Sequence, residues 1–87
     1  MKELTLFYLE TCPHCKRARA YMQELRDENA EYAAIPIKMV EEKQERQLAD
    51  SYDYFYVPCY YIGERKVAEG RIDKEGVRTV FDEALKA

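Results

Sequence analysis

Residues 4–15 of this chain read LTLFYLETCPHC, a short apolar run followed after two residues by a pair of cysteines. The near-continuous hydrophobicity of residues 4–9 predicts a central strand that is buried on both faces. Pro13 suits the first turn of a helix, where its missing N–H is not needed. Four apolar residues then recur at helical spacing: Ala18, Tyr21, Met22 and Leu25. The sequence therefore predicts that the strand leads through Cys12 into a helix over about residues 13–28.

The two cysteines form a Cys-x-x-Cys pair at the start of this predicted helix. A thiol at that position meets unpaired backbone N–H groups and the positive end of the helix dipole, which stabilise the thiolate. Because the thiolate is the form that attacks disulfides, the pair indicates thiol-disulfide exchange. We expect Cys12 to be the nucleophile and Cys15 to resolve the mixed disulfide. Pro13 and His14 lie between them, and we expect His14 to tune the thiolate by charge or hydrogen bonding.

The middle of the chain predicts a strand followed by a helix. A second strand is expected within residues 32–40, around the apolar run 33–37. Pro36 cannot donate a hydrogen bond to a ladder, so this strand should lie at an edge of the sheet. The charged stretch 41–51 fits a short helix on the surface.

The last third of the chain predicts a hairpin and a closing helix. Residues 56–62 and 66–69 flank Gly63-Glu64-Arg65, a pattern typical of two antiparallel strands joined by a tight turn. Asp73 is a suitable N-cap for the final helix, and five apolar residues follow it in a stripe: Val77, Val80, Phe81, Ala84 and Leu85. The expected order is βαβαββα, an α/β fold with a mixed four-stranded sheet flanked by helices, in one domain over residues 1–87.

Charge and composition narrow the classes of function. The net charge of −3 comes from 14 basic and 17 acidic residues in mixed runs, so no concentrated basic face predicts nucleic acid as a partner. No apolar stretch has membrane length and no signal peptide is recognisable, so we expect no membrane association and a cytoplasmic location. Three cysteines are too few for a disulfide scaffold. A close pair in a reducing compartment is catalytic or metal-binding rather than structural.

The predicted strand, the TCPHC sequence of residues 11–15, the helix after it and a later Val57-Pro58 resemble thioredoxins and glutaredoxins over nearly the whole chain. The small size resembles glutaredoxins more closely. This resemblance implies a thioredoxin fold without a bound cofactor. It also implies exchange with disulfides in proteins or small thiols, and a thioredoxin-reductase-like or glutathione-based electron donor. Finally, it implies that Pro58 is cis and faces the cysteines. Thr11, Val57 and Pro58 would then line the substrate site, with the Val57 backbone free to bond an extended substrate.

Two positions depart from the glutaredoxin pattern. Leu9 stands where the family usually has a basic residue, and the family's Gly-Gly-x-Asp turn is matched only by Glu69-Gly70 and a displaced Asp73. Because Leu9 offers no charge to carboxylates, we expect weaker binding of glutathione and better reduction of protein disulfides.

An alternative role for the same cysteines is that of a metal or iron–sulfur cluster carrier. Zinc normally needs four ligands, and only Cys59 and His14 remain as soft candidates. A cluster bridging two chains would need thiols from outside this chain. We therefore predict no metal ligands, and iron content and colour distinguish this alternative.

Two further features each have two interpretations. Cys59 is expected to be a small core residue, and its position beside Pro58 leaves a third redox thiol as the second interpretation. An aromatic cluster is expected to pack in the core and loops, or to form an apolar wall for protein substrates. Its members are Tyr52, Tyr54, Phe55, Tyr56, Tyr60 and Tyr61.

Overall fold

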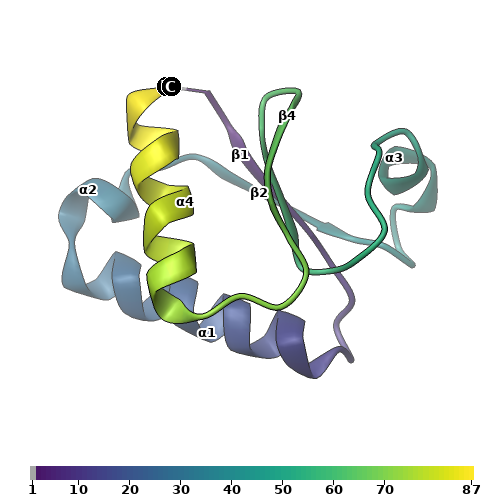
Figure 1. Ribbon diagram of the computed structural model, residues 1–87, viewed down its shortest axis with the longest axis horizontal. Coiled ribbons are helices and arrows are strands. Elements are labelled where there is room, and N and C mark those ends of the chain that lie inside the picture. Colours follow the sequence, from purple (N-terminus) through teal and green to yellow (C-terminus); the bar gives the residue numbers. More distant parts are fainter. Residues whose placement is uncertain (1) are drawn as a thin grey trace.

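The computed structural model describes residues 2–87, which form one four-stranded sheet with helices on both faces (Figure 1). The elements follow the order β1 (Leu4–Tyr8), α1 (Pro13–Glu28), α2 (Ala30–Ala33), β2 (Ile37–Glu41), α3 (Arg46–Asp50), β3 (Cys59–Ile62), β4 (Arg65–Glu69) and α4 (Lys74–Lys86). In this part of the chain, no helix combines the length and the apolar character that a membrane span requires.

The sheet has the strand order β2-β1-β3-β4. β1 is parallel to β2 and antiparallel to β3, and β3 forms an antiparallel hairpin with β4. β4 therefore runs in the same direction as β1. As a result Tyr8, Glu41 and Glu69, the last residues of β1, β2 and β4, lie at one end of the sheet together with Cys59, the first residue of β3. We call this the site end of the sheet.

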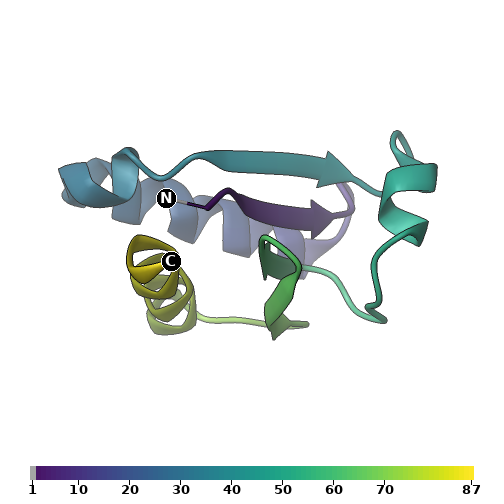
Figure 2. The same ribbon diagram turned by 90° about the horizontal axis from the view of Figure 1, so that it is seen from above.

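Two clusters of buried side chains cover the two faces of the sheet. The larger joins α1 and α4 to one face of β1 and β3, and includes Leu6, Leu25, Tyr60 and Phe81. The smaller lies on the other face, around Phe7, and is covered by α3 and the loop behind it. Figures 1 and 2 agree with this arrangement, with α3 set apart from α1 and α4 across the strands.

Several predicted elements are confirmed. α1 has the predicted bounds, with Pro13 as its first residue. The second strand lies at a sheet edge as predicted, and the hairpin and the closing helix, with Asp73 as N-cap, are present. The order of strands and helices, apart from one additional short helix, is that of the thioredoxin fold.

The apolar run 33–37 was predicted as strand, and this prediction was wrong. Ala33 belongs to the additional helix α2, and β2 begins only at Ile37. Asn29 caps α2, since its side chain accepts a hydrogen bond from the N–H of Glu31 at 2.9 Å.

The side chain of Arg26 fixes the turn between α2 and β2. Its guanidinium donates hydrogen bonds to the carbonyls of Tyr32, Ala33 and Ile35 at 3.2, 2.8 and 3.1 Å. Tyr32 and Ala33 are the last two residues of α2, and Ile35 lies between α2 and the start of β2. A side chain from α1 thus satisfies carbonyls that a continuing strand would have paired.

The other deviations lie at element ends. α3 covers only residues 46–50 of the predicted 41–51, because Glu41 still pairs with Tyr8 in the ladder. β3 begins at Cys59 rather than residue 56, after a series of bends. β1 ends at Tyr8 rather than Leu9.

Candidate active site

Cys12 lies where β1 gives way to α1, on the site end of the sheet. It is the N-cap of α1 and is partly exposed. Its backbone is held on both sides, because its N–H donates to the Leu9 carbonyl at 3.1 Å and its carbonyl accepts from the Lys16 N–H at 3.0 Å. No side-chain hydrogen bond caps this helix, and the first-turn N–H groups of His14 and Cys15 act on the Cys12 sulfur.

The environment of the Cys12 thiol favours its charged form. The backbone N–H of Cys15 lowers the pKa of Cys12 below the usual cysteine value, with further lowering by the Cys15 thiol, the His14 backbone N–H and the Arg17 guanidinium. Partial burial opposes these effects without cancelling them. A thiolate at this position is stabilised mainly by hydrogen bonds from the first turn of α1.

The other two cysteines differ from Cys12. Cys15 is fully buried, and burial raises its pKa to about 11. Cys59 is also fully buried, in the cluster around Phe7, and burial raises its pKa to about 12. The interpretation of Cys59 as a small core residue is confirmed. Only Cys12 combines exposure with a lowered pKa.

Val57 and Pro58 come to the same end of the sheet. The Val57–Pro58 peptide bond is cis, as the resemblance implied, and Pro58 is buried. Because Phe7 pairs with Cys59, Pro58 lies beside the end of β1, from which the chain continues through an exposed Thr11 to Cys12. The backbone N–H and carbonyl of Val57 have no hydrogen-bond partner within residues 2–87. The structure thus brings Thr11, Val57 and Pro58 to the same end of the sheet as the cysteine pair. That they bind substrate stays a prediction.

Glu41, at the end of β2, holds the loop that precedes Cys12. Its nearly buried carboxylate accepts hydrogen bonds from the backbone N–H groups of Glu10, Lys43 and Gln44 at 3.0, 2.6 and 3.2 Å. The bond from the Glu10 N–H is the main cause that lowers the pKa of Glu41. Sequence reasoning missed this residue, because a glutamate in a charged stretch is expected to face solvent.

His14 is exposed, and its imidazole Nδ1 lies 3.4 Å from a guanidinium nitrogen of Arg17. The effect of His14 on the Cys12 thiol comes from its backbone N–H. A tuning role for the imidazole stays a prediction. Arg17 was also missed, although its position five residues after Cys12 places it on the first turns of the same helix.

A hollow of about 300 Å³ opens beside the first turns of α1. Its lining is His14, Arg17, Tyr21, Arg71, Ile72 and Asp73. Two guanidiniums therefore border a space next to the active-site helix, and carboxylates of a small anionic thiol would find charge partners there. The guanidiniums of Arg17 and Arg71 thus supply positive charge that the apolar Leu9 cannot supply.

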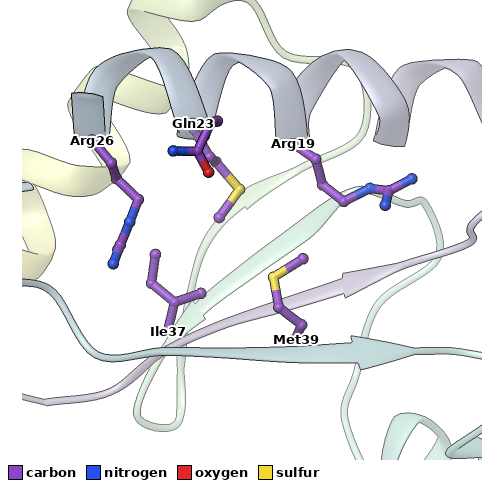
Figure 3. Close-up of a pocket in the computed structure, with 6 residues that line it drawn as sticks. Arg19, Gln23, Arg26, Ile37 and Met39 are labelled. Atoms are coloured by element: carbon purple, nitrogen blue, oxygen red, sulfur yellow. The ribbon is translucent and has the colours of Figure 1, made fainter. Parts of the chain in front are cut away.

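A second cavity, of about 230 Å³, lies between α1 and β2 (Figure 3). Arg19, Gln23 and Arg26 reach into it from α1, and Ile37 and Met39 from β2. None of the residues expected to act on a disulfide lines it. Arg26 already binds three backbone carbonyls. We do not assign the reaction to this cavity.

Within residues 2–87, no group of three or more His, Cys, Asp or Glu side chains is arranged to hold a metal ion. Cys59 is buried in a separate cluster and His14 contacts Arg17, so the two soft candidates do not join the cysteine pair in one site. The metal or cluster carrier stays an untested alternative, since a bridging cluster would take thiols from elsewhere.

Comparison with known proteins agrees with this geometry. The family model described as Glutaredoxin matches residues 4–67, which is more than half of the chain and includes Cys12, Cys15, Val57 and Pro58. The matched residues end just before Glu69, where the turn departs from the family's pattern. No curated protein matches the chain. The chain therefore belongs to the glutaredoxin family, whose members are redox enzymes that act on thiols and disulfides and are generally reduced through glutathione.

Proposed function

We propose that this chain is a dithiol enzyme that exchanges disulfides, with proteins as its better substrates. The observation that carries the proposal is the asymmetry between its two active-site thiols. Cys12 is partly exposed with a lowered pKa, whereas Cys15 is fully buried with a pKa of about 11. A nucleophile must be accessible and ionised near neutral pH, while a resolving thiol needs only to reach its partner sulfur.

The reaction follows from this assignment. The Cys12 thiolate attacks one sulfur of the substrate disulfide, forms a mixed disulfide and releases the other substrate sulfur as a thiolate. Cys15 loses its proton and attacks the Cys12 sulfur, which releases the second substrate thiol. The enzyme gives two electrons to the substrate and is left with a Cys12–Cys15 disulfide. The two substrate thiols take one proton from Cys15 and one from solvent. The reverse sequence oxidises a dithiol.

The backbone of Val57 supports an extended protein segment as substrate. Its N–H and carbonyl are unpaired within residues 2–87 and lie at the same end of the sheet as the cysteine pair. An added strand pairs through such groups, and main-chain bonding accepts many sequences. Thr11 and Pro58 border the same place from the two loops.

The electron donor in this proposal is glutathione or a thioredoxin-reductase-like protein, in the cytoplasm. Arg17 and Arg71 border the hollow beside α1, where a small anionic thiol can bind. Both side chains sit at a solvent-open surface, so their attraction to carboxylates is screened by salt. Glutathione then serves as reductant while protein disulfides remain the better substrates.

Three serine variants test the assignment. Insulin reduction is followed with glutathione plus its reductase, and in parallel with thioredoxin reductase. Cys12→Ser should abolish activity in both systems. Cys15→Ser should accumulate a mixed disulfide with the substrate, visible by mass spectrometry.

Cys59→Ser is the matched control, since it removes a buried thiol outside the reaction. It should keep Cys12 as the residue first alkylated by limiting iodoacetamide at neutral pH. Preferential alkylation of Cys15 or Cys59 in the reduced wild-type protein would show that the roles are wrongly assigned. Iron and zinc analysis of anaerobically purified protein tests the carrier alternative.

A further inference from the structure

Two aromatic side chains beside the substrate site are unusually open to solvent. Phe55 is 85% exposed and Tyr56 69%, and both directly precede Val57. The next large exposed hydrophobic residue in the described part of the chain is Met39, at 39%, on the edge strand β2. Scattered single apolar residues on a surface are ordinary, but adjacent aromatic rings that project into water mark a contact surface.

The backbone of this aromatic pair is held in place. The Glu69 carboxylate accepts hydrogen bonds from the backbone N–H of Phe55 and from that of Tyr56, the latter at 3.0 Å. The Lys66 ammonium binds the other oxygen of the same carboxylate at 2.8 Å. These interactions together lower the pKa of Glu69 to about 2, so it is charged at neutral pH.

Gly70 completes this support. Its N–H donates to the Pro58 carbonyl at 2.8 Å. Its backbone φ of +87° is one that residues with a side chain rarely adopt. A Cβ at Gly70 would lie 3.7 Å from the Cβ of Tyr56, so the glycine passes close under the aromatic pair. Residues 55–58 are therefore fixed to the end of β4 at three points, while both rings stay exposed.

The aromatic pair lies within reach of any strand bound to Val57. Two residues of chain span at most about 7 Å, which limits the distance between the Cα atoms of Phe55 and Val57. A substrate residue two positions from the reacting cysteine can therefore come against these rings. Rings held by their backbone lose little conformational entropy on contact.

We infer that Phe55 and Tyr56 form a docking surface for an apolar side chain near the reacting cysteine of a protein substrate, and that Glu69 is its positioning residue. This inference rests on the proposed disulfide exchange and names the substrate class: proteins whose cysteine has a large apolar neighbour. A small disulfide attacked at Cys12 makes no contact with the pair.

The test compares three disulfides. Two are peptide disulfides that differ only in carrying Leu or Ser two residues from the cysteine, and the third is hydroxyethyl disulfide. Wild-type protein should reduce the Leu peptide with a kcat/KM about tenfold above that of the Ser peptide. The double variant Phe55→Ser/Tyr56→Ser should lose this preference and keep its rate on hydroxyethyl disulfide. Met39→Ser, at an exposed hydrophobic residue on a distant edge, should behave as wild type.

Glu69→Ala tests whether Glu69 positions Phe55 and Tyr56 or only stabilises the fold. It should raise KM for the Leu peptide with kcat unchanged, and Glu69→Gln, which keeps an acceptor oxygen, should restore part of the preference. Equal rates of the wild type on the two peptides would overturn the docking surface while disulfide exchange stands. A wild-type protein that reduces none of the three would overturn the proposed function and the docking surface together.

Discussion

Two glutamates end the two edge strands of the sheet and hold the two halves of the active site. Glu41 ends β2 and binds the backbone N–H of Glu10, in the loop that leads to Cys12. Glu69 ends β4 and binds backbone N–H groups of Phe55 and Tyr56, in the loop that leads to Val57. Both lie at the site end of the sheet, so equivalent positions in the fold perform the same task for different loops.

The surroundings of these two carboxylates differ. Glu41 is only 8% exposed and its hydrogen bonds come from main-chain donors. The Glu69 side chain is 20% exposed and shares its charge with the ammonium of Lys66. A buried acceptor bound to backbone donors is little affected by solvent, whereas a more open ion pair responds to salt. The nucleophile's loop is thus held more firmly than the loop that meets the substrate.

The largest effect is expected from Glu41→Ala. The backbone N–H groups of Glu10 and Lys43 would lose their acceptor in a nearly buried place, while that of Gln44 keeps the Glu41 carbonyl. This loss should lower Tm by roughly 5–10 °C. The loosened loop should also slow alkylation of Cys12, because the thiol would no longer be held against the first turn of α1. Thermal unfolding and iodoacetamide kinetics measure the two effects, with Glu45→Ala as a nearby exposed control. A Tm equal to that of the control would show that Glu41 does not hold the loop.

Acid should remove the contribution of Glu69 to the stability of the folded protein. Its folded pKa of about 2 lies below the value of about 4.3 for an unfolded glutamate. Its stabilisation is therefore complete above about pH 4.3 and is lost as the pH falls toward 2. Glu69→Gln should melt below wild type at pH 6, and the gap in Tm should close by about pH 2. A gap that is constant from pH 6 to 2 would contradict this.

Added salt should change the Tm effect of Glu69 but not that of Glu41, and this difference should be smaller than the effects above. Raising NaCl shortens the screening length and weakens the attraction between Lys66 and Glu69. The difference in Tm between wild type and Glu69→Gln should narrow by about 1–2 °C. The corresponding difference for Glu41→Gln should stay the same. Equal narrowing for both variants would mean that Glu41 is as open to solvent as Glu69.

The smallest effect is expected at Arg17, which tests charge rather than loop position. Arg17→Gln should raise the pKa of Cys12 slightly and make the pair more reducing by roughly 10 mV, because the thiolate loses a favourable charge. Thiolate absorbance against pH and equilibration with a glutathione buffer measure this. Lys16→Gln removes a neighbouring charge and should leave both values unchanged.

The sequence predicted those parts of the fold that depend on local patterns. The spacing of apolar residues and Pro13 predicted α1 with its observed bounds, and Pro36 placed β2 at an edge. The cis bond before Pro58 followed from the resemblance alone. The cysteine pair was recognisable because its spacing and its place before a helix are both local features.

The missed features depend on contacts between distant residues. α2 is a four-residue helix whose end is satisfied by Arg26, and no periodicity signals so short an element. The bond from Glu10 to Glu41 joins positions 31 residues apart, so only the parallel pairing of β1 and β2 brings them together. Glu41 and Glu69 look like ordinary surface charges until the strand order places both at the site end.

The support of residues 55 and 56 by Glu69 has a consequence for how specificity can change. The carboxylate takes hydrogen bonds from main-chain N–H groups, and every residue except proline carries one. The side chains at these two positions are therefore uncoupled from the framework that displays them. Other pairs of side chains can therefore replace Phe55 and Tyr56, by natural drift or in a combinatorial library. The reaction at Cys12 and the hydrogen bonds that support the loop would stay the same.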